Sequence, residues 1–213
     1  MLGYGVMAIV LIKLGHFFQD KVALRKVSLH DEIVKGNATA ALIDFGHVVS
    51  VAIVIRSALF WVATEGWHGI PIVIAAFAIG SIAMLLISQY RVQLFKRTNR
   101  SGDCLQQAVI DGNLAVGIRY AGFLVGSASA LTAASGIAPY AADNIVASLG
   151  YWALSAAVSL VAFILLHLVT IKIILSGCDI SDEVNRQKNV GVAAISAAVS
   201  FAIGSTMATL LGA

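Results

Sequence analysis

The chain has 213 residues, of which 59% are hydrophobic and only 12% are charged, and its mean hydropathy is +0.90. This composition excludes a water-soluble domain, because too few polar residues are present to cover one, and it indicates a bilayer as the solvent. The net charge of +3 does not indicate nucleic-acid binding, since most basic residues lie in three short segments that also contain acidic residues.

Six apolar runs follow one another along the chain, each about as long as the roughly 20 residues that cross a bilayer as a helix. They cover about residues 1–19, 37–60, 69–94, 113–135, 148–174 and 189–212. Runs of this length without period-two alternation exclude a membrane β-barrel. We therefore predict an all-α polytopic membrane protein with six transmembrane helices, in one membrane domain over residues 1–213.

The basic residues predict the orientation of these helices. They gather after the first, third and fifth runs, whereas the connecting segments 61–69 and 136–148 contain none. By the positive-inside rule the three basic segments are cytoplasmic, so both termini are predicted to lie outside. The aromatic residues near the outer boundary are expected to anchor the helices in the interface. They are Trp61, Trp67, Tyr151 and Trp152.

An internal repeat organises the chain, because Asn37, Asn113 and Asn189 follow one another at a step of 76 residues. The repeating unit is a hairpin: one helix enters, a charged cytoplasmic segment follows, and a second helix leaves, starting near the asparagine. The three copies span about 1–61, 62–137 and 138–213. Since each copy crosses twice, all three have the same orientation, and we expect an axis along the membrane normal to relate them.

Two stretches around the first two asparagines resemble a known family. They read HDEIVKGNATAALI (30–43) and QQAVIDGNLAVGI (106–118), while the third copy departs at Lys188 and Gly191. These stretches are similar to the YjfL-like membrane proteins, domain of unknown function 350, and the resemblance covers essentially the whole chain. It implies a bacterial inner-membrane protein without a settled activity. It also implies soluble partners of the membrane-remodelling or ATP-grasp ligase type on the cytoplasmic face.

Small residues recur at matching positions of the outgoing helices, at a spacing that lets helix backbones approach closely in lipid. They are Gly46, Ser50, Gly122, Gly126, Ala198 and Ala202. One interpretation is bundle packing; the other is that these residues line a narrow path around a three-fold axis. The asparagines likewise have two interpretations. They cap helix N-termini, or they form a ring of amides at a selectivity constriction.

Five ionisable residues inside the apolar runs form a candidate polar layer: Lys13, His16, Asp44, His47 and Arg119. Three of them, Lys13, Asp44 and Arg119, fall at a similar depth, roughly 10 Å from the cytoplasmic boundary. Asp44 either forms a buried ion pair with one of these cations or belongs to a layer that relays an ion or proton, with His47 titrating near neutrality. The charged residues closer to helix ends are expected to snorkel to the interfaces. They are Arg56, Arg91, His167 and Lys172.

Two functions remain, since no nucleophile–base set, phosphate loop or metal-ligand spacing is evident, and we predict no enzyme activity, cofactor or metal. In the first, the protein is a membrane scaffold that recruits soluble partners through its cytoplasmic loops. In the second, it is a small ion or proton channel or transporter with a polar layer around Asp44. The first is preferred because the intramembrane charges are not repeated and no Pro-broken helix is signalled. Its expected partners are the lipid bilayer, further copies of the chain and soluble proteins, but not nucleic acid.

Overall fold

The fold, seen in a computed structural model that describes residues 2–23, 27–99 and 104–211, is all-helical over these ranges. Its long helices are α1 (Leu2–Ala23), α3 (Ala38–Trp61), α4 (Ile70–Thr98), α6 (Leu114–Thr132), α8 (Ile145–Ile174) and α10 (Val190–Leu211). Its short helices are α2 (Leu29–Val34), α5 (Leu105–Ile110), α7 (Ala134–Ile137) and α9 (Ile180–Asn185), with 3-10 turns η1 (Ala63–Gly69) and η2 (Ala142–Asn144).

Within the described residues, five of the long helices are long and apolar enough to cross a membrane: α3, α4, α6, α8 and α10. The protein is therefore a multi-pass membrane protein. In α1 the structure describes an apolar stretch over Val6–Gly15, and the sixth span remains a prediction.

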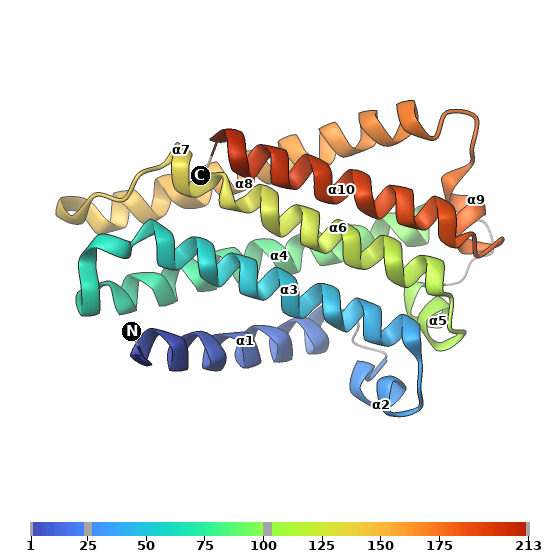
Figure 1. The fold of residues 1–213 in the computed structure, drawn as a ribbon, viewed down its shortest axis with the longest axis horizontal. Helices are drawn as coiled ribbons and strands as arrows, with labels where there is room; N and C mark the ends of the chain where they lie inside the picture. Colours follow the sequence, from blue (N-terminus) through green and yellow to red (C-terminus); the bar gives the residue numbers. More distant parts are fainter. Residues whose placement is uncertain (1, 24–26, 100–103, 212–213) are drawn as a thin grey trace.

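The helices form two layers. In the first, α6 lies between α3 and α10, and the three helices run side by side in the same direction (Figure 1). Behind this row, α4 packs against α3 and α6, and α8 packs against α4, α6 and α10, while α1 packs against α3 and α4. The outgoing helices thus form a row, and they do not surround the common axis that the repeat led us to expect.

The short helices α2, α5 and α9 all lie at one end of the molecule, which we call the basic end (Figure 1). A tight turn joins each of them to the following long helix, and one residue in each turn has a positive φ: Gly36 (85°), Gly112 (66°) and Lys188 (54°). Glycine adopts this conformation without a steric cost. The Gly-Asn pair of the first two copies is therefore a helix-ending glycine followed by a helix-starting asparagine.

At the opposite end, two of the four aromatic residues that were predicted to anchor the helices in the interface are buried. The side chains of Trp61 and Trp152 are 7% and 0% exposed, so neither can anchor in the interface. The indole of Trp61 donates to the carbonyl of Ala138 (2.6 Å), and that of Trp152 donates to Ser135 Oγ (3.1 Å). These bonds tie α3 and α8 to the segment around α7, whereas Trp67 and Tyr151 remain exposed.

Candidate anion-binding pocket

The three repeated asparagines are N-caps of the outgoing helices. Asn37 Oδ1 accepts from the backbone N–H groups of Thr39 and Ala40 at 3.0 and 3.2 Å. Asn113 Oδ1 accepts from Val116 N (3.3 Å) and Asn189 Oδ1 from Val192 N (3.2 Å). Each amide oxygen thereby satisfies N–H groups that have no partner within the helix itself.

The amide nitrogens of the first two asparagines reach the following copy. Asn37 Nδ2 donates to the carbonyl of Val109 in α5 (2.8 Å), and Asn113 Nδ2 donates to the carbonyls of Val184 and Asn185 in α9 (both 3.1 Å). Asn189, in the third copy, donates to Glu183 Oε2 (2.8 Å), and Asn37 likewise donates to Glu32 Oε2 (3.1 Å). The three amides therefore stand one per helix along the row, engaged in caps and ties, instead of facing one another in a ring.

The small residues hold the row together. A Cβ at Gly46 would lie 2.7 Å from the Cα of Ala121, and one at Gly122 would overlap the Cβ of Ala197. Gly126 and Gly204 face each other across α6 and α10 just as closely. Ser50 is buried and donates to the carbonyl of Gly46 at 2.6 Å. In contrast, Ala198 and Ala202 of the third copy are exposed.

Four of the five residues of the predicted polar layer have side chains that the structure describes: Lys13, Asp44, His47 and Arg119. Lys13 is exposed on α1 and Asp44 is half-buried on α3. His47 is buried and meets the ring of Tyr120 edge-on, with 5.9 Å between centroids. The side chain of His16 lies outside the described part of the chain.

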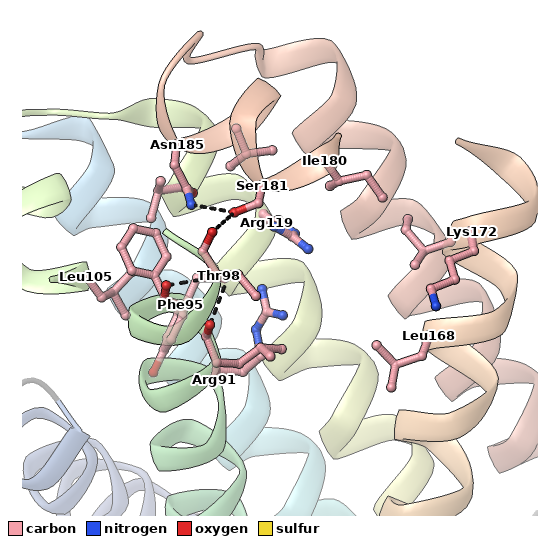
Figure 2. Close-up of a pocket in the computed structure, with 15 residues that line it drawn as sticks. Arg91, Phe95, Thr98, Leu105, Arg119, Leu168, Lys172, Ile180, Ser181 and Asn185 are labelled. Carbon is pink, nitrogen blue, oxygen red and sulfur yellow. Dashed lines mark hydrogen bonds between the residues drawn. The ribbon is translucent and has the colours of Figure 1, made fainter. Parts of the chain in front are cut away.

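Arg119 lines a cavity of about 200 Å³ at the basic end, between α4, α6, α8 and α9. Arg91 of α4 lines the same cavity, and Lys172 of α8 faces both guanidinium groups from its other side (Figure 2). Leu94, Phe95, Leu168 and Ile171 supply an apolar part of the wall. The cavity thus combines three cations from three helices with an apolar surface.

Neither arginine has a carboxylate partner among the described residues. The Nε–H groups of Arg91 and Arg119 are buried and donate to no acceptor of the described chain, and none of the described lining residues is acidic. The guanidinium of Arg91 stacks over the ring of Phe123 with 4.4 Å between Cζ and the centroid. A cation–π contact of this kind holds the side chain in place without neutralising its charge.

The roof of the cavity is α9, whose acidic residues are directed elsewhere. Asp182 accepts both Nε (2.6 Å) and Nη2 (2.8 Å) of Arg186, and Glu183 accepts from Asn189. The bonds to Asp182 raise the pKa of Arg186. These carboxylates are therefore engaged outside the cavity, and they leave its positive charge uncompensated.

Two further bonds fix the roof over the arginines. Ser181 Oγ donates to the carbonyl of Thr98 at the end of α4 (2.8 Å), and Asn185 Nδ2 donates to Ser181 Oγ (3.1 Å), as Figure 2 shows. The hydroxyl of Tyr120, a lining residue, is buried beside that of Ser88, and Oδ1 of Asn185 is buried without a described partner. The cavity can offer an anion two guanidinium groups, an ammonium group and a hydroxyl, a set suited to phosphate or carboxylate.

Sequence reasoning expected Arg91 and Lys172 to snorkel and did not join them to Arg119. A depth comparison could have found the site. Arg91 lies seven residues before the end of α4 and Arg119 six after Asn113, which places both roughly 10 Å from the basic end. The sequence does not indicate which side of each helix faces its neighbours, because these helices are apolar on nearly all sides.

Comparison with known proteins gives a family. No curated protein and no solved structure matches the chain. A family model described as Domain of Unknown Function (DUF350) matches twice, over residues 1–101 and 64–211. Two overlapping matches of one model, the second displaced along the chain, are consistent with the tandem repeat. The matches together cover nearly all residues, and the chain therefore belongs to the DUF350 family.

Proposed function

We propose that this protein is a bacterial inner-membrane scaffold that binds a phosphate-bearing anion in the Arg91–Arg119 pocket. In this proposal the basic end faces the cytoplasm and both termini lie outside. The bound anion holds α9 in place, and the three short helices α2, α5 and α9 form the surface to which soluble partners dock.

The observation that carries the proposal is the pair of arginines that line one cavity with no carboxylate beside them. Placing a cation inside a membrane helix costs about 2.5–3.5 kcal/mol on insertion scales. Two cations in one cavity repel each other as well, and a single anion between them offsets both costs. Arginine is also the side chain best shaped for bidentate contact with a phosphate group.

Two sources of that phosphate fit the cavity: a phospholipid headgroup and a soluble phosphate. The apolar part of the wall and the exposed Leu165 and Val169 on α8 suit acyl chains that extend from a headgroup. The polar roof suits a soluble ligand. Both are recognised through the same two guanidinium groups, so the test includes both.

The test measures binding to the purified protein in nanodiscs made of zwitterionic lipid. Inorganic phosphate is titrated in one arm, and phosphatidylglycerol is added to the discs in the other and read by native mass spectrometry. We expect Arg91→Gln and Arg119→Gln each to weaken binding about 10- to 100-fold, because a hydrogen bond to a charged group contributes roughly 1.5–3 kcal/mol. Arg56→Gln is the matched control, since Arg56 is exposed on α3 and stacks on Phe60.

Hydrogen exchange provides the second readout. Ligand should slow exchange of the backbone amides of residues 180–185 in the unmodified protein and leave the Arg119→Gln variant unchanged. If exchange slows with phosphatidylglycerol but not with inorganic phosphate, the pocket binds a lipid headgroup. If it slows with inorganic phosphate, the pocket binds a soluble ligand. Equal binding by the unmodified protein and both variants would contradict the proposal.

The channel alternative receives less support from the packing. The backbones of α3 and α6 meet at Gly46 and Ala121, those of α6 and α10 meet at Gly126 and Gly204, and His47 is buried against Tyr120. Contacts this close leave no space for an ion between neighbouring helices of the row at these levels. A scaffold is the function that the row favours.

A further inference from the structure

The contact between successive outgoing helices is made twice in the chain with the same residues in register. Gly46 of α3 meets Ala121 of α6, and Gly122 of α6 meets Ala197 of α10. Each second residue follows its partner at the same interval along the chain. One interface is therefore used first between α3 and α6 and again between α6 and α10.

The asparagine ties repeat with the same regularity. Asn37 Nδ2 reaches the carbonyl of Val109, and Asn113 Nδ2 reaches that of Asn185, 72 residues along the chain in both cases. Val109 and Asn185 hold corresponding positions in α5 and α9, and the residue at that position in α2 is Ile33. The close backbone contact and the tie thus belong to one docking mode.

Residues of this docking mode are exposed at both ends of the row, although α1 also packs against α3 at one of them. On α10 the residues that correspond to Gly122 and Gly126 are Ala198 and Ala202, and both are exposed, as is Asn189. On α3 the residue that corresponds to Ala121 and Ala197 is Phe45, which is 60% exposed. The face that α6 offers to α10 is repeated on α10, and the described chain does not cover it.

We infer that a second copy of the chain docks here, with α3 of one protomer packing against α10 of the next. The Phe45 ring lies over the shallow surface of Ala198 and Ala202, and Asn189 Nδ2 donates to the carbonyl of Ile33 in α2 of the neighbour. Because Phe45 replaces an alanine, the two helices stand farther apart than α3 and α6 do. This surface is separate from the arginine pocket, and the inference does not rest on the proposed function.

The forces that associate helices in a bilayer favour a second copy of the chain over lipid at this surface. Apolar helices gain no hydrophobic free energy by associating in a bilayer, so association depends on close packing and on hydrogen bonds between helices. The repeated interface supplies both. It is heterologous, since the two partners contribute different faces, so copies either close into a ring or continue as an open row.

Disulfide cross-linking in native membranes tests the inference. The full chain carries Cys104→Ser and Cys178→Ser, together with Phe45→Cys and Ala198→Cys. Intramolecular closure is excluded because α6 separates α3 from α10. Mild oxidation should give a ladder of cross-linked species. The control pair, Leu165→Cys with Ala198→Cys, places the first thiol on the exposed face of α8 and should remain monomeric.

A second variant, Ala198→Trp, tests assembly without a cross-link. Ala198 is exposed, so the larger side chain leaves the protomer fold intact, and native mass spectrometry should show assemblies reduced to single chains. The inference is overturned if the Phe45–Ala198 pair stays monomeric, which leaves lipid covering α10. It is also overturned if Ala198→Cys alone forms a dimer, which indicates a symmetric α10–α10 contact.

Discussion

Asn113 shows how much one side chain contributes to this fold. It is 2% exposed, it caps α6 through its oxygen, and its nitrogen donates to two carbonyls of α9. The same amide thus starts a membrane helix and holds the roof of the arginine pocket. Asn189 caps α10 in the same way, but it is exposed and its nitrogen serves its own copy.

This difference makes the two asparagines a matched pair for mutagenesis. We expect Asn113→Ala to lower the free energy of unfolding by about 2–3 kcal/mol, because it removes a cap and leaves two buried carbonyls with one partner fewer. Asn189→Ala should cost about 1 kcal/mol, the value of an N-cap alone. Equilibrium unfolding in mixed micelles measures both, and equal losses would show that the ties to α9 contribute nothing.

At the scale of the helices, the close contacts of α6 with its two neighbours organise the molecule. Glycines at positions 46, 122 and 126 let the backbones touch. As a result, α3 and α10 run parallel to α6, one on each side of it. Bundle packing was one of the two interpretations of the small-residue stripe, and the contacts of Gly46, Gly122 and Gly126 agree with it. The repeat and the stripe did not predict the row, because a set of equivalent helices can surround an axis or stand in line with the same residues in contact.

Substitution of two glycines separates packing from helix propensity. A Cβ at Gly122 would overlap Ala197, whereas one at Gly150 on α8 meets nothing within 4 Å. Gly122→Ala should lower the free energy of unfolding by about 1–3 kcal/mol, the usual cost of overpacking. Gly150→Ala should raise it by up to roughly 1 kcal/mol, since alanine is the better helix former. The measurement is unfolding of both variants in the same micelles, and stabilisation by Gly122→Ala would show that α6 and α10 are not in close contact.

The whole molecule has two chemically different ends. The segments that contain α2, α5 and α9 hold cations and carboxylates at the basic end (Figure 1), and the tryptophans lie at the other end, where α3 ends and α8 begins. The apolar runs predicted six membrane helices, of which five are long and apolar enough to cross in the described residues, and N-capping was one of two interpretations of the repeated asparagines. The site was predicted only in part. Arg119 was singled out, but Arg91 was assigned to the interface, since nothing in an apolar helix indicates which way a lone cation turns.

The orientation of the molecule can be measured with its own cysteine. Cys178 is exposed at the basic end, so in a Cys104→Ser variant it should react with a membrane-impermeant maleimide in inverted vesicles but not in intact cells. Val146→Cys, which puts a thiol at the exposed start of α8 at the opposite end, should show the reverse in a background without native cysteines. Labelling of Cys178 in intact cells would place the basic end outside.

The buried tryptophans have a consequence for spectroscopy. All three tryptophans of the chain lie at the end opposite the arginine pocket, and the rings of Trp61 and Trp152 are only 5.7 Å apart. Their ultraviolet emission therefore comes from two adjacent, shielded indoles and the exposed Trp67, and none of the three lines the pocket. A change in that emission on filling the pocket cannot come from contact with the ligand. It reports motion transmitted along the full length of the helices.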